Sequence, residues 1–306
     1  MKRLLLFMLT VALLAACERK PAEKPVETPA DPVTVATLDT TPKPLFAFCH
    51  NARRIQMIYG DLVDSIVEPL RQDADQYTRL YMSPDECYEV RYVDETLTDS
   101  EGNLLSPGEI HLEKYPAPGL NYALTDKTAF KAKGYDMEFG LLVAEDYLAS
   151  HPLLKIAPAH GDMPKELVEE LEKKYQMEAN FGSWEYAIGE HGYYGVLQFK
   201  HKGDEITALE VYYDGTKSYT LAEVGRYYEP EGEYEPISYW NVEDDGFYMV
   251  SQLFEAFEGP QGVELYYVRY AAESCTCGVL CTRPDGSLVR NQQAYYYYMT
   301  MMEASY

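Results

Sequence analysis

The chain has 306 residues, with 26 Lys and Arg against 50 Asp and Glu, and its formal net charge is −24. Hydrophobic residues make up 46% and charged residues 25%, which is ordinary globular usage and excludes a wholly disordered chain, a collagen-like chain and a polytopic membrane protein. Because phosphate binding needs a basic face, this excess of acidic residues argues against nucleic acid as a partner.

The first residues have the pattern of an export signal. Lys2 and Arg3 form a basic start, and the apolar run at 4–16 is too short to span a bilayer as an ordinary helix. The stretch Leu14-Ala15-Ala16-Cys17 resembles the lipobox of bacterial lipoproteins, whose signal is cut before the cysteine. The resemblance implies that Cys17 carries lipid and that a lipid bilayer is the partner through this anchor. The alternative is a plain secretory signal followed by a cysteine.

The residue after the lipidated cysteine helps to sort such proteins between membranes. Here it is Glu18 and not Asp, which by the family's usual rule implies the outer membrane of a bacterial envelope, facing either the periplasm or the cell surface. Removing the signal removes two positive charges, so the formal charge falls from −24 to −26. Anionic head groups repel such a chain, so the lipid is the expected contact with the membrane.

Composition divides the chain into three parts, which are a signal peptide at 1–16, a lipidated cysteine with a Pro-rich disordered linker at 17–44, and a folded region at 45–306. The linker has six prolines and few large apolar residues, so it cannot offset the ordering entropy of a packed core. At about 3.1 Å per residue it would hold the folded region up to about 80 Å from the membrane. A further division into two subdomains near residue 178 is an option.

Five cysteines remain for the folded region, and an exported chain meets oxidising conditions. Cys49 and Cys87 flank a predicted helix and are the candidate disulfide. The second cluster is Cys275, Cys277 and Cys281, for which one local disulfide with a leftover thiol is the simpler interpretation. A redox pair or a thiolate metal site is the alternative, although the C-x-C-x3-C spacing differs from that of zinc ribbons.

The folded region is predicted to be α+β, with an N-terminal helical portion and a hairpin before a largely antiparallel sheet. Apolar residues recur at intervals of three and four over 51–81, which predicts a long helix. The segment 88–115 predicts a hairpin that turns at 100–103. Further helices are predicted at 137–149, 164–177 and 252–257.

After about residue 180 the apolar pattern changes to a period of two. Three strands of a meander are predicted at 193–201, 205–213 and 216–224, the second connection carrying the hairpin signal Asp214-Gly215. Additional strands are predicted at 237–241, 246–250, 263–271, 279–282 and 287–301. The second half is therefore expected to form a Tyr-rich β-sheet.

Tyrosine is the most unusual feature of the composition, with 29 Tyr against 10 Phe and 2 Trp. Many occur as doublets, and adjacent residues of a strand point to opposite faces of a sheet. One interpretation is cross-strand stacking of the rings, which stabilises sheets by about 0.2–1 kcal/mol per pair. The other is an exposed ladder of phenols that, with carboxylates between the rings, would bind a glycan, a peptide or a basic protein.

The sequence carries no motif that identifies a reaction. It has no H-E-x-x-H, G-x-S-x-G, S-x-x-K, P-loop or G-x-G-x-x-G pattern, and its six histidines lack ligand spacing. Catalytic residues are therefore unknown, and neither a metal nor another cofactor is expected. With 50 carboxylates, a glycosidase pair could be placed almost anywhere, so none is chosen.

Three functions remain as hypotheses. The favoured one is a non-catalytic binding or scaffold domain of the envelope, with an exposed aromatic and acidic surface and no buried cluster of titratable groups. The second is a glycan or peptidoglycan hydrolase, which requires a cleft with two carboxyls, one of raised pKa. The third is a binder or inhibitor of a cationic protein, supported by the net charge.

Overall fold

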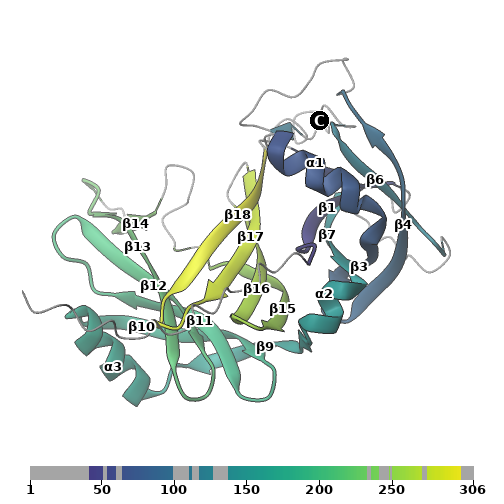
Figure 1. The fold of residues 1–306 in the computed structure, drawn as a ribbon. Helices are drawn as coiled ribbons and strands as arrows, with labels where there is room; N and C mark the ends of the chain where they lie inside the picture. The colour runs from purple at the N-terminus through teal and green to yellow at the C-terminus, as the bar shows by residue number, and fades with distance from the viewer. Residues whose placement is uncertain are drawn as a thin grey trace, which may run out of the picture. The chain divides into compact units, whose positions relative to one another are not determined.

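The computed structural model describes residues 41–50, 54–59, 64–98, 110–111, 117–126, 137–232, 236–240, 248, 250–270 and 274–297. The predicted signal peptide, Cys17 and most of the linker lie outside these residues. From Thr41 onward the chain forms one compact unit, built mostly of antiparallel strands (Figure 1). In the described part of the chain, none of the helices has both the length and the apolar character needed to cross a bilayer.

The first half of the unit closes into a six-stranded barrel with the strand order β1-β2-β6-β4-β3-β7. Its strands are β1 (Leu45–His50), β2 (Arg54–Ile58), β3 (Tyr77–Ser83), β4 (Glu86–Thr96), β6 (Gly119–Leu124) and β7 (Met137–Ala144). Helix α1 (Asp64–Asp73) and the 3-10 turn η1 (Ala74–Gln76) follow β2, and Val67, Leu70 and Ala74 pack onto the barrel core. As in other small barrels, side chains fill the interior.

The second half forms two six-stranded sheets. The sheet that we call the central sheet has the order β5 (Ile110–His111), β18 (Leu288–Tyr297), β17 (Ser274–Thr282), β16 (Gly262–Tyr270), β15 (Gln252–Gly259), β8 (Leu153–Leu154). The outer sheet has the order β14 (Ile237–Tyr239), β13 (Ser218–Tyr228), β12 (Glu205–Tyr213), β11 (Gly192–Phe199), β10 (Ala179–Ile188), β9 (Ile156–Asp162). Helix α2 (Glu145–Ser150) follows the barrel, and α3 (Lys165–Tyr175) follows β9.

Both faces of the central sheet are buried. On one face Tyr266 and Phe257 pack against barrel residues such as Phe46. On the other face Tyr267 and Leu265 pack against the outer sheet. The adjacent residues Tyr266 and Tyr267 point to opposite faces, yet they are only 1% and 0% exposed. The central sheet is therefore the middle layer between the barrel and the outer sheet.

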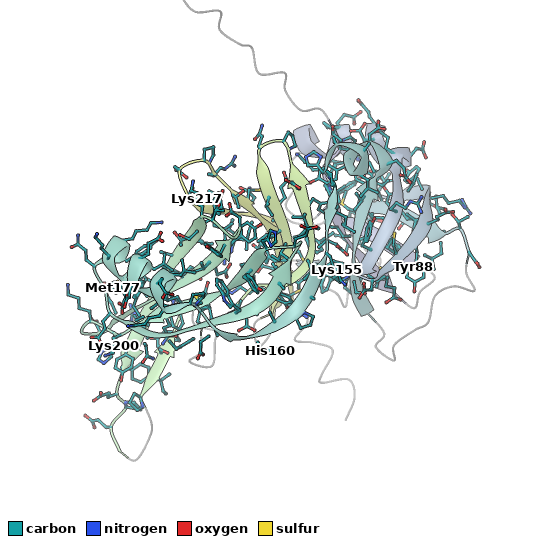
Figure 2. All side chains as sticks on the ribbon, turned by 90° about the horizontal axis from the view of Figure 1, so that it is seen from below. Tyr88, Lys155, His160, Met177, Lys200 and Lys217 are labelled. Atoms are coloured by element: carbon teal, nitrogen blue, oxygen red, sulfur yellow. The ribbon has the colours of Figure 1, made fainter. Side chains whose placement is uncertain are left out.

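Helix α3 covers the opposite face of the outer sheet. Its buried residues Leu167 and Leu171 pack with Trp184, Leu197 and Phe199 of β10 and β11. Beyond the helix end, Lys200 forms an ion pair with Glu178 beside Met177 (Figure 2). The predicted helix at 164–177 and the three meander strands are confirmed, since β11, β12 and β13 pair antiparallel in sequence order.

The predicted α+β class is wrong, because the described chain is mostly β and its first half is a barrel, not a helical portion. Strand β7 occupies most of the predicted helix 137–149, and Leu141, Leu142 and Val143 are all 0% exposed. Leu142 belongs to the barrel core, whereas Leu141 and Val143 face the central sheet. A strand covered on both faces is continuously apolar and cannot be distinguished from a buried helix by periodicity.

Helix α1 lies inside the predicted helix 51–81, but the other described elements of that range are strands and a 3-10 turn, and the predicted helix 252–257 is a strand. In the predicted helix 51–81 the structure has β2, α1, η1 and β3, and the register of β3 shifts between Tyr77 and Arg79. The shift places Tyr77 and Leu80, three residues apart, in the same core. In β15, predicted as a helix at 252–257, a shift between Leu253 and Glu255 has the same effect. A bulge adds one residue to a strand and so converts a spacing of two into three.

The predicted hairpin at 88–115 is also wrong. Strand β4 pairs with β3 and β6 of the barrel, whereas β5 pairs parallel with β18 of the central sheet. The two segments therefore belong to different sheets. The expected turn at 100–103 lies outside the described residues.

Among the described residues, one buried carboxyl group has no hydrogen-bond partner. Glu255 of β15 is 0% exposed, and neither of its oxygens has a hydrogen-bond partner among the described residues. Burial, with a smaller effect of Asp85, raises the pKa of Glu255 to about 8. The charge of Glu255 in turn contributes to raising the pKa of Tyr81 and Cys87, which places the carboxyl beside β3 and β4.

We expect Glu255 to make the protein less stable as the pH rises. Between the unfolded pKa near 4.5 and the folded pKa of about 8, the unfolded state releases this proton and the folded state keeps it. The free energy of unfolding should therefore fall by up to about 1.4 kcal/mol per pH unit from this group, and Glu255→Gln should remove that slope. Urea unfolding at pH 5 to 8 measures it.

The matched control is Glu258→Gln, an exposed residue of the same strand, which should leave the slope unchanged. Curves for Glu255→Gln and the unchanged protein that stay parallel across this range would contradict the assignment.

Candidate functional site

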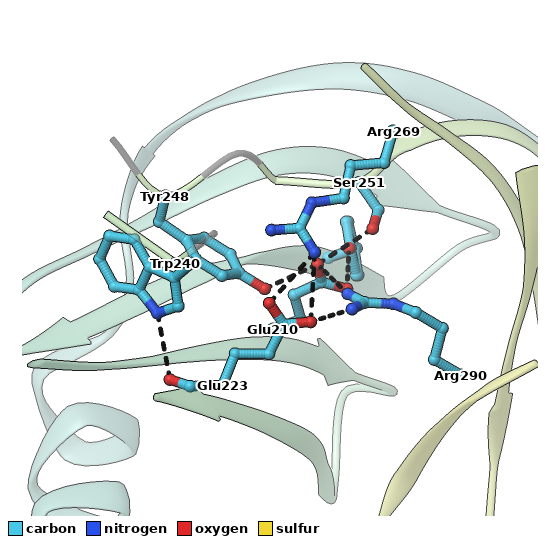
Figure 3. A network of polar contacts seen from close by, with 8 residues as sticks. Glu210, Glu223, Trp240, Tyr248, Ser251, Arg269 and Arg290 are labelled. Carbon is cyan, nitrogen blue, oxygen red and sulfur yellow. Dashed lines mark hydrogen bonds and ion pairs between the residues drawn. The ribbon is translucent and has the colours of Figure 1, made fainter. Parts of the chain in front are cut away.

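Charged groups meet between the central and outer sheets (Figure 3). Glu210 of β12 and Glu223 of β13 come from the outer sheet, and Arg269 of β16 and Arg290 of β18 come from the central sheet. The side chain of Glu210 is 0% exposed, and the other three are between 15% and 21% exposed. We call these four residues the inter-sheet network.

Glu210 is the centre of the network. Its Oε1 accepts hydrogen bonds from Arg290 Nη2 at 2.7 Å, from Tyr248 Oη at 2.9 Å and from Ser251 Oγ at 3.0 Å. Its Oε2 accepts from Tyr194 Oη at 2.7 Å. Burial and the charge of Glu210 raise the pKa of Tyr194 and Tyr248 well above the usual value, so both phenols stay protonated donors.

Glu223 completes the charge balance. It pairs with Arg290, and Arg269 Nη1 donates to its two oxygens at 3.1 and 3.3 Å. Tyr248 lies over the Arg269 guanidinium at 5.3 Å and contacts Trp240 edge-on at 5.0 Å between ring centroids. Two carboxylates and two guanidiniums thus cancel in charge and join the two sheets, although the buried Arg290 Nε has no hydrogen-bond partner among the described residues.

The sequence analysis missed this network, and its expectation of no buried titratable cluster for a binding domain is wrong. A signal was present in β12, where Ile206, Ala208 and Glu210 stand at every second position and therefore share one buried face of the strand. A carboxylate on an otherwise apolar inward face requires a partner. The partner itself lies 80 residues further along the chain, and local pattern does not identify it.

A second feature is a pocket of about 260 Å³ at one end of the central sheet. Glu264 and Tyr266 of β16, Cys281 of β17, Arg283 just beyond it and Asn291 of β18 line the pocket, together with Lys43. Glu264 lies directly opposite Cys281 in the strand pairing.

The groups of this pocket are held in unreactive forms. Glu264 accepts hydrogen bonds from Tyr147 Oη and Tyr266 Oη, and Lys43 Nζ lies 3.6 Å from its other oxygen. Burial and then the charge of Glu264 raise the pKa of the Cys281 thiol, which Arg283 and Lys43 only partly oppose. Because the thiolate is the nucleophile, a raised pKa makes Cys281 a weak one.

The candidate disulfide between Cys49 and Cys87 is not formed. Cys49 lies in the barrel core, where its Sγ is 3.5 Å from Met82 Sδ, whereas Cys87 is exposed on β4. In the barrel order, β1 and β4 are not neighbours. The two thiols therefore lie on different strands with opposite surroundings.

The second cysteine cluster occupies one face of β17. Cys275 and Cys277 are buried against the barrel, and Cys281 is partly exposed at the pocket; all three are free. Burial and the neighbouring Cys275 raise the pKa of Cys277 well above its usual value. Among the described residues, no group of three or more His, Cys, Asp or Glu is arranged to hold a metal ion.

The tyrosine doublets are more buried than the exposed ladder of phenols considered above would be. Tyr194, Tyr212, Tyr266 and Tyr267 are buried, whereas Tyr193 is 39% exposed and Tyr228 is 45% exposed. Tyr193 packs on Trp184 with ring centroids 5.5 Å apart. Stacking within and between layers therefore accounts for the described inner rings. The side chains of residues 295–298 are not among those that the structure describes.

Comparison with known proteins gives no relative: no family model, no curated protein and no solved structure matches the chain. The site is therefore interpreted from its own geometry.

We expect Glu210→Gln to lower the urea concentration at which the central and outer sheets unfold. Glu210→Gln removes the charge to which Arg290 Nη2 donates, although Arg290 keeps its pair with Glu223, and loss of a buried hydrogen bond to a charged group costs about 1.5–3 kcal/mol. Glu169→Gln on α3 is the matched control, because Lys165 and Glu169 are 84% and 59% exposed and such pairs contribute below about 1 kcal/mol. Urea unfolding of both variants measures the difference, and equal midpoints would contradict a stabilising role for the network.

Proposed function

We propose that this protein is a non-catalytic binding domain, attached to a bacterial envelope membrane through lipid on Cys17. The lipobox-like stretch Leu14-Ala15-Ala16-Cys17 and the Pro-rich segment after it support the anchor. The partner expected for the folded region is a glycan or a peptide of the envelope.

The composition of the pocket is the observation that carries the non-catalytic assignment. Glycosidases use two carboxyl groups about 5–10 Å apart on either side of the bond that is cleaved. Among the described residues that line the pocket there is a single carboxylate, Glu264, and two phenols already occupy one of its oxygens. Glu255, a described carboxyl whose pKa is clearly raised, is fully buried and does not line this pocket. The pocket therefore has groups that hold a ligand and lacks an acid and base pair.

A second candidate is a binder of a cationic protein. It is favoured by the formal charge of −24, which would accelerate encounter with a basic partner and make the association sensitive to salt.

The anchor predicts a change of location. Cys17→Ala should remove the lipid and release the protein from the membrane fraction, since one cysteine carries the whole attachment. Fractionation of cells with and without this substitution, and mass spectrometry of the N-terminal peptide, check the result. Cys87→Ser is the control, because this exposed thiol lies outside the signal. Membrane attachment that survives Cys17→Ala would exclude the proposed anchor.

The binding function predicts association without cleavage. The full mature chain, purified in detergent, should sediment with peptidoglycan sacculi and release no soluble fragments from them. Fragment release that Glu264→Gln abolishes would establish the hydrolase alternative. Binding to a basic protein such as lysozyme that weakens at high salt, with no binding to sacculi, would establish the second candidate.

A further inference from the structure

The pocket beside Cys281 contains an unusual cation. Arg283 is partly buried and has no carboxylate partner among the described residues, although the whole chain has 50 Asp and Glu against 26 Lys and Arg. A guanidinium presents a planar fork of donors that fits a carboxylate. In so acidic a chain, an arginine at a pocket wall without an acidic partner favours an anionic group of a ligand.

The opposite charge is present in the same pocket. Glu264 is 17% exposed, and its Oε2 accepts from Tyr147 and Tyr266, which fixes the carboxylate in place. Its Oε1 lies toward Lys43 at 3.6 Å, and the Lys43 side chain is 47% exposed. The Lys43–Glu264 distance is longer than the roughly 2.7–2.9 Å that is usual for a charged hydrogen bond, and Lys43, whose Nζ also lies over the Tyr147 ring at 5.4 Å, is half exposed, so a ligand ammonium can compete with it for Oε1.

The size of the pocket limits the ligand. About 260 Å³ is below the usual range of about 300–1,000 Å³ for drug-sized molecules. Asn291 adds an amide, whose Nδ2 donates to Cys281 Sγ at 3.6 Å, and Tyr266 forms an apolar wall. The walls therefore fit a small molecule that carries both a carboxylate and an amine.

From this combination we propose that the pocket binds a small α-amino carboxylate, with the carboxylate on Arg283 and the ammonium on Glu264. The inference rests on the proposed binding function and names its ligand. Two sources share this chemistry: a free amino acid, and an amino acid that is attached to an envelope peptide through its side chain, so that its amine and its carboxylate both stay free.

The test uses the full mature chain and calorimetric titration with each standard amino acid in turn. At least one should bind with a Kd below about 10 mM, and its amide and its N-acetyl derivative, which lack the carboxylate and the amine charge, should each bind at least about tenfold more weakly. Arg283→Gln and Glu264→Gln should each reduce affinity by a similar factor. Arg226→Gln, an exposed arginine of β13 outside the pocket, is the matched control and should leave affinity unchanged.

Two results would overturn the proposal: no amino acid binds, or the N-acetyl derivative binds as well as its parent. Thermal unfolding without ligand shows whether each variant is folded, and Arg283→Lys, which keeps the charge, should retain part of the affinity if Glu264→Gln proves unstable.

Competition with sacculi separates the sources. If the amino acid displaces the protein from sacculi, the natural ligand is carried by the peptide; if it binds and does not displace, the ligand is the free molecule. Retained sedimentation with sacculi in the absence of any amino acid binding would refute this inference and leave the binding function standing.

Discussion

The central sheet is buried on both faces, and the rest of the structure depends on this constraint. A group on such a sheet is most stable when it is apolar, paired or neutral, because little of either face reaches water. Arg269 and Arg290 face the outer sheet and are paired there with Glu223 and Glu210. On the barrel side, Glu264 is held by two phenols. Glu255 has no hydrogen-bond partner in the part of the chain that the structure describes, and burial raises its pKa to about 8, so that it is mostly neutral at neutral pH.

The pocket lies where this double burial ends. Along β17, Cys275 and Cys277 are covered by the barrel, whereas Cys281, on the same face, is partly exposed. The strand thus passes from a sealed layer into an open edge, and the side chains near that edge become pocket walls. The same geometry separates two kinds of charged group. The inter-sheet network is balanced in charge and joins the two sheets, whereas Arg283 at the edge has no acidic partner among the described residues.

The errors of sequence interpretation have the same origin. Helix α3 was predicted correctly because it buries a single stripe. Strands β11 and β12 are buried on both faces, and the Asp214-Gly215 turn signal helped to place β12 and β13. Strands β7 and β15 were predicted as helices. Strand β7 is apolar on both faces, and β15 contains a bulge that produces the spacing of a helix. Periodicity reports which residues are buried, and where both faces of an element are buried a further local signal, such as a turn, is needed to identify the element.

The sequence by itself determined the acidic charge, the exclusion of several protein classes, the expectation of a lipid anchor at Cys17, and the elements with regular local period. Those properties are set by composition or by neighbouring residues. Only the tertiary structure decided that the first half is a barrel, that Cys49 and Cys87 lie apart, and which residues form the network and the pocket. The physical reason is separation along the chain: the hydrogen bond between Arg290 and Glu210 spans 80 residues. Such a contact forms because stacked layers exclude water from both charges, and no local pattern of the chain specifies which layers stack.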